Sequence, residues 1–278
     1  MNTKSRRDFL GTLSTLAPLG AFAYLLPRSA WAAPPAEAPA PTDPLAGLDP
    51  DSPDFAVKAL RRIDDLYRGK SSHGLMEMEV KTKHWTRQIA MESWSLGEDY
   101  SLVRIVFPKK AAGTATLKSN DDLFTYLSKT GRTIKITGGM MAGSWMGSHF
   151  TNDDLVQGAR LSDDFVITRE KSGESPDTYV FRLVPKPDAA VVWGRIDATI
   201  RRSDLQPVEQ RFYDEDGELS RKMIFSDIKT IAGKTLPTRI RMEPMDKPGE
   251  YTEMRHKRIE FDVAIDESFF TLQKLRSL

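Results

Sequence analysis

Polar and apolar residues alternate at every second position along most of the chain. Met76, Met78 and Val80 alternate with charged neighbours, and similar runs recur towards the C-terminus. This period predicts β-strands with one buried face. Turn signals separate the runs, one of which extends from Val191 to Arg201, and Asp216-Gly217 is the strongest hairpin signal. Because no strand–helix–strand unit of about 30 residues occurs, the sequence predicts a mainly β, antiparallel fold of about eleven strands, as in barrels and sandwiches.

One segment before the strands has the period of a helix. Its apolar residues recur at spacings of three and four from Phe55 to Tyr67, and charged residues occupy the other face. Ser52 as the N-cap and Pro53 at the first helical position predict its start. Gly69 predicts its end. We therefore expect an amphipathic helix of roughly four turns that covers the apolar face of the sheet.

Residues 138–154 interrupt the strand pattern with a glycine-rich insert. It carries five large apolar side chains: Met140, Met141, Trp145, Met146 and Phe150. Methionine adapts to varied shapes, and glycine permits unusual backbone dihedral angles. The insert is therefore interpreted either as a plug that fills a core or as a movable lid over a cavity, and its composition leaves both readings open.

The N-terminus has the pattern of an export signal. Arg6 and Arg7 precede an apolar run that starts with Phe9 and Leu10, and Ala30 and Ala32 form a small-x-small cleavage pattern. A twin-arginine signal peptide over 1–32 is predicted, and with it export to the periplasm. The proline- and alanine-rich stretch 33–50 is a predicted linker. No composition break follows, so 51–278 is expected to form one domain.

Composition excludes several kinds of function. The chain has 278 residues, a formal net charge of +1 and no cysteine. Disulfides and cysteine nucleophiles are therefore excluded, and nothing indicates a nucleic-acid partner. The four histidines have no metal-binding spacing, so neither a metal nor another cofactor is expected. Lys109-Lys110 is expected to be a solvated edge.

A catalytic set is not apparent either. Ser144, Ser148, His149 and Asp153 lie close together in the sequence, but no GxSxG motif surrounds the serines. Proximity in sequence says little, because triads are assembled in space. The protein is expected not to be an enzyme, and a hydrolase is the least favoured hypothesis.

Several motifs in order resemble those of the LolA-like family of outer-membrane lipoprotein-sorting proteins, and Ser-Trp-Met-Gly-Ser is the most specific of them. The motifs span nearly all of 51–278. They are Arg104-Ile-Val-Phe-Pro108, Gly113-Thr-Ala115, Asp122-Leu-Phe-Thr-Tyr126, Arg132-Thr-Ile-Lys-Ile136, Ser144-Trp-Met-Gly-Ser-His-Phe-Thr-Asn-Asp-Asp154, Tyr213-Asp214 with Gly217, and Ile265-Asp266 with Phe270-Thr271.

The resemblance implies a single half-open antiparallel β-barrel with helices over its open face, which shields acyl chains in the periplasm. It places Met140, Met141, Trp145, Met146 and Phe150 at the lid or mouth. It implies a carrier for a lipid or a lipidated protein, monomeric and working beside an inner-membrane exporter. His149 departs from the family pattern, in which an acidic residue is expected. The alternative hypothesis is a structural or sensory interaction module with a filled barrel, which binds a partner by strand addition.

Overall fold

The computed structural model describes residues 45–67, 69–157, 164–189 and 191–277. The predicted signal peptide over 1–32, with Arg6, Arg7, Phe9, Leu10, Ala30 and Ala32, lies outside the described residues, as does most of the 33–50 linker. Everything described falls within one compact unit of the chain, residues 41–278. None of the described helices has the length and hydropathy needed to cross a membrane.

The amphipathic helix is present as α1 (Phe55–Tyr67). It begins two residues later than expected, because Ser52 and Pro53 belong to a preceding turn in which the Phe55 N–H donates to the Ser52 carbonyl. Its apolar residues Phe55, Ala59 and Ile63 are buried, as the three- and four-residue spacing predicts.

The strands form one antiparallel sheet in which neighbours in sequence are mostly neighbours in space. Its order is β6-β5-β4-β3-β2-β1-β13-β12-β11-β10-β9-β8-β7. The strands are β1 (Ser71–Lys81), β2 (Thr86–Leu96), β3 (Tyr100–Phe107), β4 (Ala115–Ser119), β5 (Asp122–Leu127), β6 (Arg132–Ile136), β7 (Phe165–Arg169), β8 (Thr178–Pro185), β9 (Arg195–Arg201), β10 (Pro207–Tyr213), β11 (Leu219–Ile231), β12 (Lys234–Pro244) and β13 (Tyr251–Phe261).

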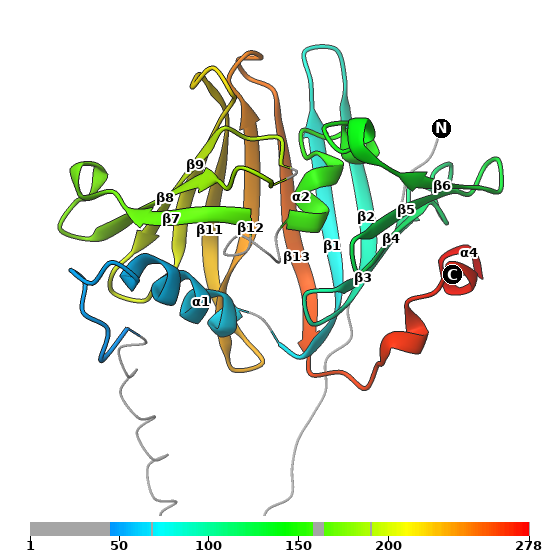
Figure 1. The fold of residues 1–278 in the computed structure, drawn as a ribbon. Helices are drawn as coiled ribbons and strands as arrows, with labels where there is room; N and C mark the ends of the chain where they lie inside the picture. Colours follow the sequence, from blue (N-terminus) through cyan, green and yellow to red (C-terminus); the bar gives the residue numbers. More distant parts are fainter. Residues whose placement is uncertain (1–44, 68, 158–163, 190, 278) are drawn as a thin grey trace, which may run out of the picture. The chain divides into compact units, whose positions relative to one another are not determined.

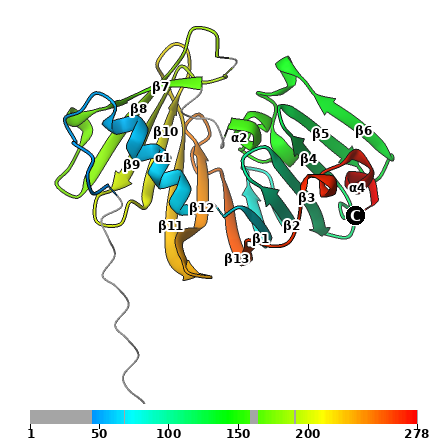
Figure 2. The same cartoon turned by 60° about the horizontal axis from the view of Figure 1, so that its bottom comes forward.

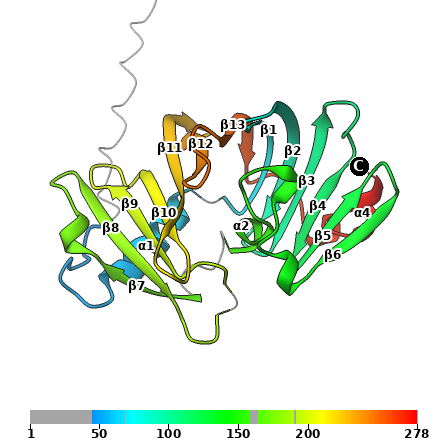
Figure 3. The same cartoon turned by 90° about the horizontal axis from the view of Figure 1, so that it is seen from above.

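The sheet is not closed, because β6 and β7 form its two ends. The mainly β, antiparallel prediction is confirmed, but the described residues contain 13 strands, and the expected total of about eleven is too low. Viewed from above, the sheet bends into an arc with α1 and α2 on its inner side (Figure 1, Figure 3).

One expected strand begins later than the sequence predicts. Alternation favoured a strand from Val191, whereas β9 starts at Arg195. The reason is a close backbone approach at Gly194, whose N–H donates to the Tyr213 carbonyl. A Cβ atom at this position would lie 2.4 Å from the Asp214 carbonyl oxygen, so only glycine fits there.

Apolar side chains cover both faces of the sheet. On the concave face the register sets Met78 opposite Ile89 and Met254, and Met254 opposite Ile240, so a continuous core runs across the strands. On the convex face Leu102 and Leu117 of neighbouring strands form a second, smaller core. The alternation along each strand separates these two layers.

The C-terminal segment covers the convex core. It consists of the 3₁₀ turn η4 (Glu267–Phe269) and the helix α4 (Leu272–Ser277). Phe270 and Leu275 are buried against β3 and β4. Figure 2 shows α4 beside this part of the sheet, in agreement with its contact with β4. No local signal in the sequence predicts that this segment covers a second core.

The insert lies on the opposite, concave side. It contains the 3₁₀ turns η1 (Gly138–Met140) and η2 (Trp145–Gly147) and ends in the helix α2 (Asn152–Gln157). Thr151 caps α2, since its hydroxyl accepts from the Asp154 N–H at 3.3 Å while the Asp154 carboxylate accepts from the Thr151 N–H at 2.7 Å. This reciprocal pair is a capping box. A further 3₁₀ turn, η3 (Lys171–Gly173), lies between β7 and β8.

Candidate functional site

An apolar cavity of about 420 Å³ lies between α1, the insert and the concave face of the sheet. Leu60 and Ile63 of α1 line one side, and Trp145 and Phe150 of the insert line another. Strands β8 to β13 form the floor, which includes Ala198, Ile200, Met223, Phe225, Ile240 and Met254. Cavities of this size and apolar character are typical of small-molecule binding sites.

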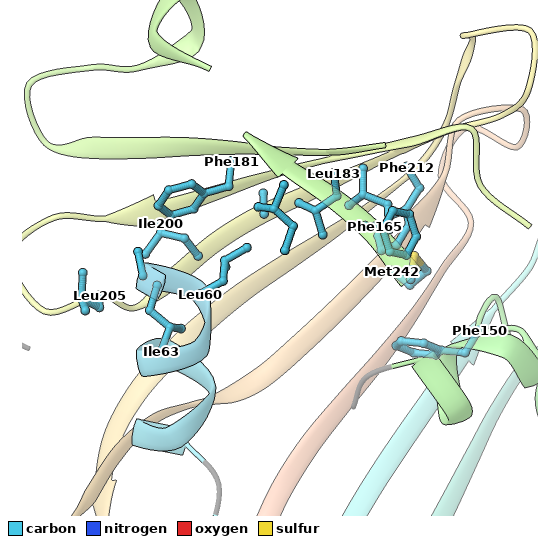
Figure 4. Packing of buried hydrophobic residues seen from close by; sticks show 14 of the residues in the cluster. Leu60, Ile63, Phe150, Phe165, Phe181, Leu183, Ile200, Leu205, Phe212 and Met242 are labelled. Atoms are coloured by element: carbon cyan, nitrogen blue, oxygen red, sulfur yellow. The ribbon is translucent and has the colours of Figure 1, made fainter. Parts of the chain in front are cut away.

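The period of two along the strands produces the floor of the cavity. On β9, Ile196, Ala198 and Ile200 face the cavity and are nearly fully buried, whereas Asp197 and Thr199 face the other side. Figure 4 shows Leu60 and Ile63 on the helix below Ile200 and Leu183, with Phe150 on the side of the insert. The cavity is therefore the space that α1 and the insert leave unfilled over the concave face of the sheet.

The backbone of the insert takes an uncommon conformation at its centre. Met146 has a φ of 49° and Gly147 a φ of 69°. Positive φ is unfavourable for methionine and is sustained only by its surroundings. Here the Arg87 guanidinium donates to the Met146 carbonyl, and a Cβ on Gly147 would lie 3.3 Å from Arg87 Nη2. Arg87 on β2 thus holds this turn against the sheet.

Two further side chains of the insert form hydrogen bonds with the sheet. Trp145 Nε1 donates to Thr116 Oγ1 on β4 at 3.1 Å. His149 Nδ1 lies 2.8 Å from Thr252 Oγ1 on β13, and its Nε2 lies 3.2 Å from Glu250 Oε2. The His149 backbone N–H also donates to Thr252 Oγ1 at 2.9 Å. His149 therefore lies at the contact between the insert and the sheet.

A buried ion pair joins the last part of the insert to β11. Arg221 Nη1 donates to Asp154 Oδ2 at 2.9 Å and to the His149 carbonyl at 3.3 Å. Its guanidinium carbon lies 4.2 Å from the Trp193 ring centre and 4.4 Å from that of Phe212. The Arg221 side chain is 5% exposed, so its charge depends on Asp154 for compensation.

A second carboxylate, Asp153, lies beside this pair and is 2% exposed. Burial, reinforced by the negative charge of Asp154, raises the pKa of Asp153 to about 7. Its Oδ2 atom has no hydrogen-bond partner within the described part of the chain. Asp153 therefore titrates near neutral pH, whereas an ordinary aspartate is fully ionised there.

The five predicted site residues do not all lie at the cavity. Trp145 and Phe150 line the cavity and are 3% and 4% exposed. Met146 is half-buried and packs against the concave core. Met140 is 43% exposed, and neither it nor the half-exposed Met141 belongs to the cavity lining. Two of the five thus line the cavity, Met146 packs beside it, and Met140 and Met141 form the outer part of the insert.

The residues considered for a hydrolase do not form a catalytic arrangement. Ser144 Oγ donates to the Ser148 carbonyl at 2.5 Å, and Ser148 Oγ donates to the Trp145 carbonyl at 2.7 Å. Both nitrogens of His149 face Thr252 and Glu250, away from these hydroxyls. No group of three or more potential metal ligands occurs among the residues that the structure describes.

No local sequence signal predicts the polar contacts that hold the insert. Arg221 and Asp154 are 67 positions apart, and His149 and Thr252 are 103 apart. The apolar floor had a signal, the strand alternation, but alternation does not distinguish a lined cavity from a filled core. Only the three-dimensional arrangement brings these residues together.

An open antiparallel sheet with helices over an apolar concave face is a LolA-like fold. Several solved structures have the same fold as this chain. A DUF1329 family protein from Desulfovibrio piger has 21% identity and a TM-score of 0.72, over 84% of this chain and 100% of its own. A domain described as an outer membrane lipoprotein-sorting protein, from Vibrio parahaemolyticus, has 22% identity and a TM-score of 0.69, over 80% of this chain and 99% of its own.

A LolA superfamily protein from Nitrosomonas europaea has 21% identity and a TM-score of 0.66, over 78% of this chain and 98% of its own. At such identities the likeness establishes the fold, which is LolA-like. Residues 97–277 match the model of a family described as "Uncharacterized protein", and the chain belongs to that family. No protein of curated function matches the sequence significantly.

Proposed function

We propose that this protein is a carrier that binds an acyl chain of a lipid or lipidated protein in the concave cavity. The observation that carries the proposal is the cavity itself, whose walls are almost entirely aliphatic and aromatic. Burial of methylene groups drives binding to such a surface without covalent chemistry. The LolA-like fold supports a carrier over a catalyst.

The volume of the cavity matches one chain. A methylene group occupies about as much space as a water molecule in the liquid, roughly 30 Å³. A cavity of about 420 Å³ therefore accommodates on the order of 14 methylenes. At ~0.8 kcal/mol per buried methylene, transfer of such a chain from water is favourable by on the order of 10 kcal/mol before the cost of association.

Entry of a chain requires that a cover move, and the insert is the proposed lid. Besides the buried rings of Trp145 and Phe150, its contacts with the sheet are individual hydrogen bonds and one ion pair, and its centre holds a methionine at positive φ. Such contacts exchange with water more readily than packed rings do. In this proposal Trp145, Met146 and Phe150 move with the lid, while Met140 and Met141 form its outer surface.

The cellular setting follows from the N-terminal sequence. We propose that residues 1–32 direct twin-arginine export, that 33–50 is a spacer and that 51–278 carries the ligand in the periplasm. The protein would act as a monomer and receive or deliver its ligand beside an inner-membrane exporter. Periplasmic location is compatible with the absence of cysteine, since no residue then depends on the redox state of the compartment.

A pair of variants tests the cavity. Ala198→Trp places an indole in the cavity, whereas Thr199→Trp places the same group on the opposite face of the same strand. We expect Ala198→Trp to reduce the affinity for a fluorescent fatty acid by at least tenfold and Thr199→Trp to leave it within twofold. Thermal unfolding of both variants checks that the fold is kept.

The ligand of the native protein gives an independent test. Native mass spectrometry and organic extraction of the purified protein should detect a co-purifying acyl lipid, and Trp145→Ala should reduce its amount. Equal fatty-acid affinity in Ala198→Trp and the parent, together with a lipid-free protein, would overturn the proposal and favour an interaction module.

A further inference from the structure

The cavity wall contains one polar side chain that the fold does not use. Gln210 on β10 lines the cavity, and it has no hydrogen-bond partner among the described residues. The second polar residue of the wall, Asp154, is already bound to Arg221 and to the Thr151 N–H. The Gln210 amide is thus the free polar group of an otherwise apolar surface.

The register fixes Gln210 on the cavity side of the sheet. It is paired with Ala198 on β9 and with Met223 on β11, and both of these residues also line the cavity. Phe212, two positions further along β10, also lines the cavity. Val208, two positions earlier, lies at a register shift of the strand and is 38% exposed. The partly exposed Gln210 side chain therefore lies among aliphatic and aromatic groups of the wall, and a ligand that fills the cavity would remove its amide from water.

An amide has two donors and one acceptor oxygen. Saturated hydrocarbon can satisfy neither of them, so a ligand of methylenes alone would leave Gln210 desolvated and unpaired. An ester or amide carbonyl at the head of an acyl chain would accept from the Gln210 NH₂ group. The acyl carbonyl is the group of a lipid that lies directly beside its methylenes.

We propose that Gln210 hydrogen-bonds the carbonyl of the bound acyl chain and makes the site select acyl esters and amides over alkyl chains. This inference rests on the proposed carrier function and adds the chemical class of its ligand. A site built to pair a polar group of its ligand discriminates strongly against the analogue that lacks this group, because the protein group is then left without a partner.

Two glycerol lipids that differ in one group test the inference. A 1-monoacylglycerol and a 1-O-alkylglycerol of equal chain length share the head and the chain, and only the first has a carbonyl. Displacement of a fluorescent fatty acid gives both affinities. We expect the parent protein to prefer the acyl compound by about tenfold, the effect of one buried hydrogen bond and its unpaired partner.

The variant Gln210→Leu should remove the preference, so that the two affinities agree within twofold, and the affinity for the alkyl compound should stay equal or rise. Gln88→Leu, a matched change at an exposed glutamine of β2 that contacts Glu79, should keep the parent's preference. Equal affinities in the parent, or an unchanged preference in Gln210→Leu, would overturn the role of Gln210 and leave the carrier function intact. Failure of both lipids to bind the parent would overturn the carrier function as well.

Discussion

The C-terminal segment on the convex face and the insert on the concave face both cover apolar strands, but different contacts hold them. Phe269 and Phe270 pack their rings against Trp94 and Tyr100, with ring centres 5.5 Å apart in each case. The insert also buries two rings, Trp145 and Phe150, in the concave core, but it adds polar contacts that the C-terminal segment does not use: hydrogen bonds from Trp145 and His149 and the Asp154–Arg221 pair.

The two faces of the sheet also differ in how completely their covers fill them. The convex cover fills its side of β3 and β4, with Phe270 and Leu275 almost fully buried. The concave covers leave a cavity of about 420 Å³. In the proposed carrier, the convex cover stays a part of the core, whereas the concave insert is the part that moves.

The largest effect is expected on the convex side. Leu275→Ala should lower the free energy of unfolding by about 3 kcal/mol, because the leucine is 1% exposed and its removal leaves a cavity. Fatty-acid affinity should not change. Urea denaturation and a binding titration measure the two quantities. Leu272→Ala, at a residue 36% exposed, is the control and should cost far less. A large loss of affinity in Leu275→Ala would mean that the two faces are not independent.

Breaking the buried Arg221–Asp154 ion pair should lower the free energy of unfolding by nearly as much as Leu275→Ala. Arg221→Met removes the partner of Asp154 and should cost about 3 kcal/mol of unfolding free energy, since a lone buried charge remains. The double variant Arg221→Met with Asp154→Asn should recover part of the loss. A double-mutant cycle with a coupling energy near zero would contradict the role given to this pair.

A pH-dependent effect of intermediate size is expected at Asp153. Its pKa in the folded protein is about 7, above the usual 3.8, so the folded state binds the proton more tightly than the unfolded state. Its stabilising contribution is present below pH 3.8 and is lost as the pH rises towards 7. Relative to Asp153→Asn, the parent should therefore lose about 2 kcal/mol between pH 5 and pH 7. Parallel stability curves for the two proteins over this range would rule out the raised pKa.

The smallest effect is expected from a single hydrogen bond of the insert. Trp145→Phe removes the indole N–H that donates to Thr116 Oγ1 and should cost about 1 kcal/mol. Because the contact holds the lid, the rate of fatty-acid release should rise, which stopped-flow fluorescence measures. Thr116→Val should reproduce the change from the other partner. A release rate that neither variant alters would indicate that the insert does not limit exit.

The helices and strands could be predicted from the sequence because the spacing of their apolar residues depends only on neighbouring positions in the chain. The spacing from Phe55 to Tyr67 predicted α1, and the period of two predicted the antiparallel sheet. The convex core was not foreseen, because Leu102 and Leu117 read as ordinary strand residues until a cover is placed on their face. Strand alternation identifies which residues share a face, but not what covers that face.

The site was predictable in part for a related reason. The apolar insert stood out by its composition, and the structure sets two of its members, Trp145 and Phe150, in the cavity wall. Gln210 and Arg221 carried no signal, because a single polar residue in a strand is usually solvent-facing and their neighbours in space are distant in sequence. Their roles depend on the register and curvature of the sheet.

The central claim, that the concave cavity holds an acyl chain, is tested most directly by a crystal structure with a fatty acid brominated near its methyl end. Anomalous scattering locates the bromine without reference to the protein density. We predict a single strong peak between α1 and the floor of the cavity, within van der Waals contact of the residues around Ala198 and Ile200. A bound fatty acid whose bromine lies outside this cavity, or a cavity that stays empty at saturating ligand, would contradict the claim.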